Sequence, residues 1–368
     1  MKVSQRLVSL DVFRGLTIIL MIIVNTPGTW AHVFSPLRHS EWHGCTPTDL
    51  VFPFFLFIVG VAMWFSFKKF DHKFTKYALL KILKRTALIF LIGLFMNAFP
   101  KFDIAHLRIM GVLQRIALAY GLGAFLILLF GSRGRWVLAF AVLFGYWIIM
   151  WVFGGDNPYG LENNFARKID LAVFGINHVH KGFGIPFEPE GLLSTLPAMV
   201  NVLLGFLAGE IIGKTEIKKN IPLKLLVYGG VSVLLAILWN TIFPINKPLW
   251  TSSYVLCSVG IGMISLAILI WIIDIKEWRK WAHPFLVYGM NPLALYVLSI
   301  LWVKVILYLV YFRSDGETLN GYAWLYQKVF IPIGGPGEFG SFLFALFHGV
   351  LFWLIGYILY RKKIFIKI

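Results

Sequence analysis

The chain has 368 residues, of which 59% are hydrophobic and only 14% are charged, whereas a soluble globular protein carries about 25% charged residues. This composition excludes an ordinary soluble enzyme and is typical of a helical protein that crosses a membrane several times. In a soluble protein the formal net charge of +17 would suggest a nucleic-acid partner, so the placement of the charges matters as much as their sum.

Long apolar runs predict an all-α fold rather than a membrane β-barrel. Barrel strands alternate apolar and polar residues, whereas segments 87–96 and 261–273 are almost continuously apolar. Because a helix needs roughly 20 apolar residues to cross a bilayer, we predict a transmembrane helical bundle of about ten spans, or eleven. Residues 1–368 form one transmembrane domain in this interpretation. The ten predicted spans are 11–31, 48–67, 82–99, 109–130, 136–153, 191–212, 222–243, 253–274, 284–311 and 339–360.

The distribution of Lys and Arg indicates how these spans are oriented. With a cytoplasmic N-terminus, 22 of the 34 basic residues fall on the cytoplasmic side and nine on the opposite side. The positive-inside rule therefore predicts that both termini are cytoplasmic. Because topology then explains the basic charge, we expect the lipid bilayer as a partner and no nucleic acid.

Three features outside the spans add to this prediction. The apolar run after Gly15 shows no Ala-x-Ala cleavage signature, so we expect the first helix to be retained. Segment 68–85 combines seven basic residues with aromatic and Leu side chains, and we expect it to lie on an anionic leaflet rather than to bind phosphate. The long predicted non-cytoplasmic loops, where a polar substrate could be held, are 32–47, 154–190 and 312–338.

Ionisable side chains inside predicted spans are informative because each is costly unless it is paired or hydrated. Asp11 and Arg14 are three residues apart and share a helix face, where they can neutralise each other. A simple ion pair at the membrane interface is an equally good interpretation. Gln114 and Arg115 lie inside the fourth predicted span. Since Arg115 keeps its proton, it needs a carboxylate, a phosphate or a water-filled cavity.

The densest group of polar residues follows the first predicted span. Asn25 precedes Thr26-Pro-Gly, which predicts an interrupted helix. His39 and His43 come next, and Asp49 stands at the start of the second span. A His side chain can take a proton near neutral pH, and an Asn amide can stabilise an oxyanion. A single loop His is more often only solvated, and Asp49 is equally interpreted as a helix cap.

Further polar residues lie at the same predicted level of the membrane. Glu190 precedes the sixth span, and Asn246-Lys-Pro-Leu-Trp250 separates the seventh from the eighth. Both are also typical of solvated loops with an interfacial Trp. Asn291, followed by proline, predicts a kink in the ninth span whose freed backbone groups need partners. Cys45 and Cys257 form neither a metal spacing nor a disulfide framework, and no metal site is expected.

Seven sequence blocks carry a resemblance to a known family. They are Arg6-Leu-Val-Ser-Leu-Asp-Val-Phe-Arg-Gly15, Trp42-His-Gly with Asp49-Leu-Val-Phe-Pro53, Arg108-Ile-Met-Gly-Val-Leu-Gln-Arg115, Glu188-Pro-Glu-Gly191, Pro244-Ile-Asn-Lys-Pro-Leu-Trp250, Gly289-Met-Asn291 and Leu359-Tyr-Arg-Lys-Lys-Ile-Phe365. On these blocks the chain resembles the heparan-α-glucosaminide N-acetyltransferase family, including bacterial relatives linked to amino-sugar metabolism. The blocks recur in order across almost the whole chain, so their joint match is specific.

The resemblance implies an enzyme of the bacterial inner membrane that takes an acetyl group from cytosolic acetyl-CoA. It implies delivery to the amino group of a glucosamine-type sugar on the other side of the membrane. Carried over by position, the family's essential histidine matches His39 and its active-site asparagine matches Asn25. The spacing of this loop differs from that of the animal enzymes, which keeps His43 open as the alternative to His39. The chain lacks the long N-terminal luminal domain of the animal enzymes, so polymeric heparan sulfate is not the expected acceptor.

The resemblance and the polar residues together predict site roles. Arg14 would bind the phosphates of acetyl-CoA. Gln114 and Arg115 would line the path of its pantetheine arm or support the site between the first and fourth spans. His39 would take a proton from the amino group while Asn25 holds the oxyanion. Direct transfer is the preferred mechanism, and an acetyl-histidine intermediate stays open. The predicted acceptor-binding residues are Asp49, Glu190, Asn246, Lys247, Trp250 and Asn291.

Two alternative functions stay open at this point. A secondary transporter of amino sugars would also need interrupted helices and polar residues at mid-membrane. A related acyltransferase would modify a hydroxyl group of a cell-envelope glycan instead of an amino group. The sequence also leaves a homodimer open.

Overall fold

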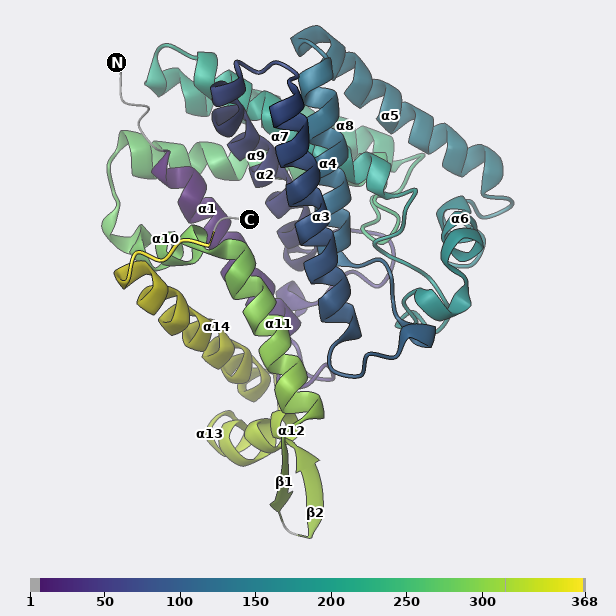
Figure 1. Cartoon of the computed structure of the whole chain (residues 1–368), viewed down its shortest axis with the longest axis vertical. Helices are drawn as coiled ribbons and strands as arrows, with labels where there is room; N and C mark the ends of the chain where they lie inside the picture. Colours follow the sequence, from purple (N-terminus) through teal and green to yellow (C-terminus); the bar gives the residue numbers. More distant parts are fainter. Residues whose placement is uncertain (1–6, 315, 367–368) are drawn as a thin grey trace.

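The computed structural model describes residues 7–314 and 316–366, and Lys2, Arg6 and Lys367 of the charge count lie outside them. The described chain is a bundle of α-helices with one short antiparallel β-hairpin, which projects from the lower end in Figure 1. The hairpin pairs β1 (Tyr311–Ser314) with β2 (Glu317–Asn320). The helices are α1 (Val8–Asn25), α2 (Val51–Phe67), α3 (Lys76–Ala98), α4 (Val112–Leu129), α5 (Ser132–Phe153), α6 (Phe165–Phe174), α7 (Thr195–Lys214), α8 (Ile221–Asn240), α9 (Ser252–Leu269), α10 (His283–Met290), α11 (Pro292–Tyr308), α12 (Gly321–Leu325), α13 (Ile331–Gly334) and α14 (Glu338–Arg361).

The predicted spans coincide with these helices, which confirms the all-α fold class. Each span matches one helix, except that 284–311 matches the bent pair α10 and α11. By length and composition, eight helices of the described chain can cross a membrane, and the bent pair makes nine. The predicted count of about ten also included α3, which is less apolar because Lys81, Lys84 and Arg85 lie on it.

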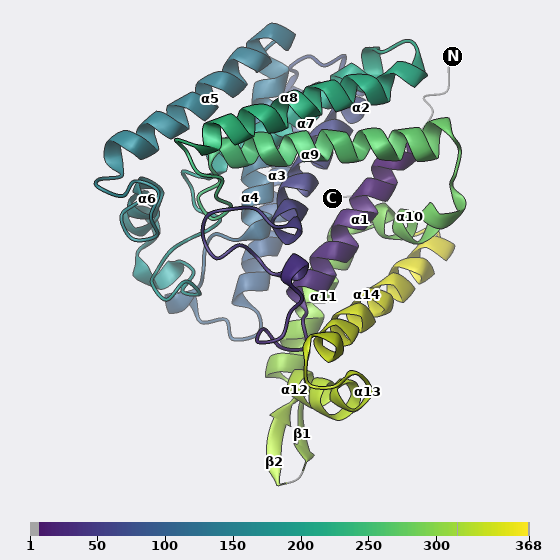
Figure 2. The ribbon, with the colours of Figure 1, turned by 180° about the vertical axis from the view of Figure 1, so that it is seen from behind.

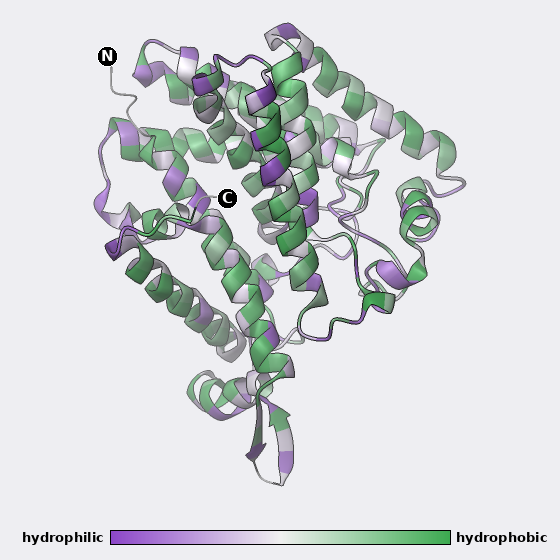
Figure 3. Cartoon of the chain, in the orientation of Figure 1, coloured by the Kyte–Doolittle hydropathy of each residue, from purple (hydrophilic) through white to green (hydrophobic). Residues whose placement is uncertain are grey.

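Apolar side chains cover much of the outside of the bundle. The most apolar stretches of α5, α8 and α14 are only 22%, 28% and 33% buried, whereas that of α7 is 83% buried. Figure 3 shows apolar residues along the lengths of the helices and hydrophilic residues in the connecting segments. Because soluble monomers do not expose apolar surface of this extent, α5, α8 and α14 face lipid around a core that contains α7. The chain is therefore an integral membrane protein.

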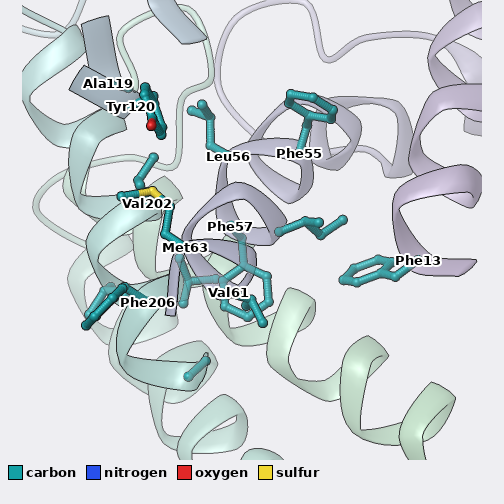
Figure 4. Close-up of a cluster of buried hydrophobic side chains, with 14 of the residues drawn as sticks. Phe13, Phe55, Leu56, Phe57, Val61, Met63, Ala119, Tyr120, Val202 and Phe206 are labelled. Carbon is teal, nitrogen blue, oxygen red and sulfur yellow. The ribbon is translucent and has the colours of Figure 1, made fainter. Parts of the chain in front are cut away.

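At the centre of the bundle, α7 packs closely against α2. A Cβ atom at Gly60 would lie 2.0 Å from the carbonyl oxygen of Val202, and one at Gly205 would lie 2.2 Å from that of Phe57. Small residues allow helix backbones in membranes to approach this closely. Phe57, Val202 and Phe206 belong to the buried apolar cluster around this crossing (Figure 4). This packing fixes α2, whose N-terminal end follows the loop that carries His39.

Two helix breaks shape the region next to α1, which lies beside α10 (Figure 2). α1 ends at Asn25, and Thr26 leaves the helical backbone, as expected for a residue that precedes proline. α10 and α11 meet at Asn291 with a bend of 73°. Both predicted interruptions are confirmed. They leave Asn25 at a helix end and allow α11 to turn toward α1.

Candidate functional site

Four cavities follow one another from the space between α1, α2, α4 and α11 to the connecting segments around His39 and Glu190. The basic cavity, of about 420 Å³, has Arg14, Lys69 and Arg85 in its wall. The neck measures about 10 Å³, and the histidine chamber beyond it about 130 Å³. The loop cavity, of about 400 Å³, is lined by the segments around His39 and Glu190. Successive cavities share lining residues, so each adjoins the next.

The neck is the narrowest part of this series. It shares Phe55, Ile116 and Leu293 with the basic cavity, and Met21 and Tyr296 with the histidine chamber. Its volume suits about one water molecule, and its walls, including the part that Tyr296 contributes, are apolar. Side chains must therefore move before anything wider than water can pass.

The histidine chamber and the loop cavity meet at His39. His39, Val112, Glu190 and Lys247 line both spaces. Asn25, at the end of α1, lines the chamber. The structure thus brings four of the predicted site residues, from four separate segments, around one space.

Asp49 sets the orientation of His39. Its Oδ1 atom lies 2.7 Å from His39 Nδ1, and its side chain is only 1% exposed. Its Oδ2 atom accepts hydrogen bonds from the N–H groups of Ser40 and Thr46, each at 3.0 Å. Because a carboxylate can only accept, Nδ1 carries the proton and Nε2 keeps its lone pair. Asp49 therefore holds His39 and caps the short 3₁₀ turn Pro47–Leu50 that leads into α2. It also lines the loop cavity, where contact with the acceptor stays a prediction.

Lys247 brings a positive charge to the same pair. Its Nζ atom lies 3.3 Å from Asp49 Oδ1 and 3.1 Å from His39 Nδ1. Since Nδ1 already donates to Asp49, the ammonium group of Lys247 donates to that carboxylate as well. Burial lowers the pKa of Lys247, although the carboxylates of Asp49 and Glu190 oppose this shift.

The reasoning from sequence missed Arg108 and Glu188 as site residues. Nη2 of Arg108 lies 2.5 Å from a carboxylate oxygen of Glu188 and 2.5 Å from one of Glu190. Glu188 is fully buried and also accepts the N–H groups of His180 and Glu190, so it holds the loop together. Burial alone would raise the pKa of Glu190. The positive charges of nearby basic groups, of which Arg108 contributes most, have the larger effect and lower this pKa. Arg108 and Glu188 are 80 residues apart, so no local pattern could have paired them.

Asn246 and Trp250, both predicted to bind the acceptor, mainly support the loop cavity from behind. Asn246 is fully buried, donates to the Trp42 carbonyl oxygen at 2.9 Å and accepts the N–H of Leu249 at 2.7 Å. Trp250 is 1% exposed and donates from Nε1 to Asn201 Oδ1 at 2.9 Å. The Asn246 amide is used within the protein, and the structure does not bring it into the lining of the loop cavity. Trp250 lines the loop cavity but shows little ring surface to it.

The structure moves Gln114 and Arg115 away from the predicted pantetheine path. Arg115 is fully buried, donates from Nη2 to the Gly191 carbonyl oxygen at 3.2 Å, and lies 4.8 Å from the ring centroid of Trp250. Gln114 faces α3, where a Cβ atom at Gly93 would lie 2.5 Å from its Oε1 atom. Within the described chain neither residue lines any of the four cavities. Of their two predicted roles, the structure places both residues where they support the site rather than in the wall of these cavities.

Asn291 and Arg14 both lie near the basic cavity. The Asn291 amide donates to the Ile364 carbonyl oxygen at 3.0 Å and accepts the N–H of Ile366 at 2.8 Å. Since Ile366 lines the basic cavity, Asn291 holds the C-terminal segment there. The structure therefore places Asn291 at the opposite end of the series from the other predicted acceptor residues. Arg14 lines the basic cavity and pairs with Asp11 at 3.0 Å.

His43, the alternative to His39, points elsewhere. Its Nδ1 atom lies 3.3 Å from the amide nitrogen of Asn246, and burial lowers its pKa. Among the described residues that line the chamber and the loop cavity, His39 is present in both sets and His43 in neither. The structure therefore brings His39, and not His43, to the space where the chamber and the loop cavity meet.

Comparison with known proteins gives this arrangement a family. Residues 6–242 match the family described as heparan-alpha-glucosaminide N-acetyltransferase, catalytic. The chain belongs to this family. The curated heparan-alpha-glucosaminide N-acetyltransferases of Homo sapiens and Mus musculus are each 28% identical to it, over 99% of the chain and over 60% and 61% of their own lengths. The resemblance carried by the sequence blocks is thus confirmed.

Proposed function

We propose that this member of the heparan-α-glucosaminide N-acetyltransferase family moves an acetyl group from cytosolic acetyl-CoA to the amino group of a glucosamine-type sugar across the bacterial cytoplasmic membrane. The observation that carries the proposal is the series of cavities that leads from a basic mouth to His39. A soluble nucleotide and a sugar can each enter from its own side of such a series and meet at one group.

The basic cavity suits the phosphorylated end of acetyl-CoA. Arg14, Lys69 and Arg85 line it, and basic side chains are the usual partners of phosphate oxygens. The Arg85 guanidinium also lies 4.6 Å from the ring centroid of Tyr120, which lines the same cavity. With the nucleotide held there, the slim pantetheine arm would cross the neck once Met21 and Phe55 move aside.

His39 supplies the base of the proposed reaction. With its Nδ1 proton donated to Asp49, Nε2 takes a proton from the attacking amino group. The Asn25 amide, which also lines the chamber, donates a hydrogen bond to the carbonyl oxygen as negative charge develops on it. We propose direct transfer, in which donor and acceptor are bound together.

The loop cavity is the proposed acceptor site. Its volume of about 400 Å³ lies within the usual range of about 300–1,000 Å³ for small-molecule sites. Glu190 offers a carboxylate for sugar hydroxyls or the ammonium group, while Lys247 and Arg108 offer donors. The acceptor amine must lose its charge before it attacks, and the neighbouring Arg108 and Lys247 charges favour the neutral amine.

The test uses the purified protein in lipid nanodiscs with acetyl-CoA and glucosamine. We expect N-acetylglucosamine and free CoA in equal amounts. His39→Ala should lower kcat by at least about 100-fold while the affinity for CoA stays unchanged, because His39 lies beyond the neck. His43→Ala, on the same loop, is the matched control and should keep turnover within a few-fold of wild type. Full activity of His39→Ala, or no product from the wild-type protein, would refute the proposal.

A further inference from the structure

The buried tyrosines of the described chain fall into two groups. Four donate their hydroxyl hydrogen to a backbone carbonyl oxygen, namely Tyr146 to Leu249, Tyr254 to Asp49, Tyr288 to Gly349 and Tyr326 to Pro336. Since buried polar groups in proteins are nearly always hydrogen-bonded, this is the expected state. The other two, Tyr120 and Tyr296, have no hydrogen-bond partner for the hydroxyl among the described residues.

Both exceptions line a cavity. Tyr120 lines the basic cavity, and Tyr296 lines the neck and the histidine chamber. A hydroxyl that has no hydrogen-bond partner among the described residues and belongs to a residue that lines a cavity is available to a ligand. These two positions mark two points along the proposed path of acetyl-CoA, one at the nucleotide end and one at the thioester end.

Tyr296 stands where the reacting bond would lie. Met21 and Tyr296 are the described residues common to the neck and the chamber, and only Tyr296 carries a hydroxyl. If the pantetheine arm enters through the neck and the acetyl group reaches His39 in the chamber, the sulfur atom lies at the junction between the two. This placement rests on the proposed function.

We infer that Tyr296 is a catalytic residue that donates a hydrogen bond to the departing sulfur. In the transfer step the amine nitrogen forms the new C–N bond with its lone pair, and its proton goes to His39 Nε2. The C–S bond breaks and its electron pair stays on sulfur, which leaves as a thiolate. Tyr296 keeps its proton and stabilises that thiolate, which is then protonated by solvent.

The apolar surroundings make this hydrogen bond important. Within the described chain, the neck is lined only by apolar atoms, those of Ile18, Met21, Phe55, Leu113, Ile116, Leu293 and Tyr296, so it offers no donor to a thiolate. Where the neck meets the chamber, the Tyr296 hydroxyl is the donor that the shared lining residues provide. An anion that forms against apolar walls loses its hydration and depends on the donors that the protein provides. Asn25 and His39 are assigned to the carbonyl oxygen and the amine, so the sulfur would otherwise be unassisted.

The test compares Tyr296→Phe with wild type in nanodiscs. Phe keeps the ring that shapes the neck and removes only the hydroxyl. We expect kcat to fall by about 10- to 100-fold with KM for acetyl-CoA unchanged. Tyr308→Phe, on the exposed end of the same helix α11, is the matched control and should leave kcat unchanged.

A binding measurement gives a second readout that does not depend on turnover. The wild-type protein should bind CoA about fivefold more tightly than desulfo-CoA, which lacks the sulfur. In Tyr296→Phe this ratio should fall toward one, whereas in Tyr120→Phe it should stay as in wild type. An unchanged ratio in Tyr296→Phe, or an equal loss of affinity for both ligands, would overturn the inference.

The two proposals fail differently. A wild-type protein that binds CoA but makes no acetylated sugar contradicts the proposed function, and the binding ratio still decides the role of Tyr296. An active wild type with an equally active Tyr296→Phe contradicts only the role of Tyr296.

Discussion

At the scale of single residues, one buried carboxylate arranges the whole His39 loop. Asp49 accepts the N–H groups of Ser40 and Thr46, the Thr46 hydroxyl, the His39 ring and the Lys247 ammonium group. The same carboxylate that caps the 3₁₀ turn Pro47–Leu50 before α2 therefore fixes the tautomer of His39. A residue that sequence patterns identify as a helix cap can thus also determine which ring nitrogen is free to accept a proton.

Asp170 carries a testable pH dependence of stability. It lies on α6, is 1% exposed and accepts the N–H of Leu192 at 2.7 Å, and burial raises its pKa to about 7. Because this pKa is above the unfolded value of about 3.9, the stabilisation is complete below that value and is lost as the pH rises toward about 7. Asp170→Asn keeps a carbonyl acceptor for Leu192 but cannot ionise.

We therefore expect Asp170→Asn to unfold several degrees higher than wild type at about pH 8, with the gain shrinking as the pH falls toward about 4. Thermal unfolding of the detergent-solubilised protein measures this. Asp156→Asn, in an exposed loop, is the control and should not change the midpoint. A gain of the same size at every pH would contradict the assignment.

The sequence predicted which residues lie in the site better than it predicted what each of them does there. The sequence identified His39, Asn25, Glu190 and Lys247, and the structure places them around one chamber. It could not predict the roles of Asn246 or Asn291, because an amide at a helix break serves a ligand and a neighbouring backbone equally well. Tyr296 carried no local signal, since a Tyr within an apolar span is usually a packing residue.

At the scale of elements, α3 differs from the other long helices. Its first half carries basic residues, and Arg85 turns into the basic cavity while Lys84 is exposed. We expected segment 68–85 to lie on the anionic leaflet rather than to bind phosphate, and the proposed phosphate site departs from that expectation for Lys69 and Arg85. The structure adds that Lys69 and Arg85 line a cavity. Sequence alone could not show this, because helix periodicity tells which residues share a face but not whether that face borders lipid headgroups or a cavity.

Arg85→Ala should therefore raise KM for acetyl-CoA by about 10-fold and change kcat little, because the lost contact serves binding and lies far from His39. Lys84→Ala, the neighbouring exposed residue, is the matched control and should leave both parameters unchanged. Steady-state kinetics at low salt measures the difference, since screening weakens such contacts. A larger effect of Lys84→Ala than of Arg85→Ala would contradict the assignment of the phosphate site.

At the scale of the whole molecule, the cavities explain why the site is divided among distant segments. Hydropathy and charge predicted the helices and their order, because a helix that crosses lipid needs a long apolar run and because basic loops remain on the cytoplasmic side. They could not predict the neck, which depends on how α1, α2, α4 and α11 pack against one another. The series gives each substrate its own entrance and leaves one narrow junction for the chemistry.

The most direct measurement of this account uses sealed vesicles that contain the protein in a single orientation. Acetyl-CoA is supplied on the face where the basic cavity opens and glucosamine only on the other face. The account predicts N-acetylglucosamine on the glucosamine side and an equal amount of free CoA on the acetyl-CoA side. Product that forms only when both substrates share one face, or uptake of unmodified glucosamine without release of CoA, would contradict it.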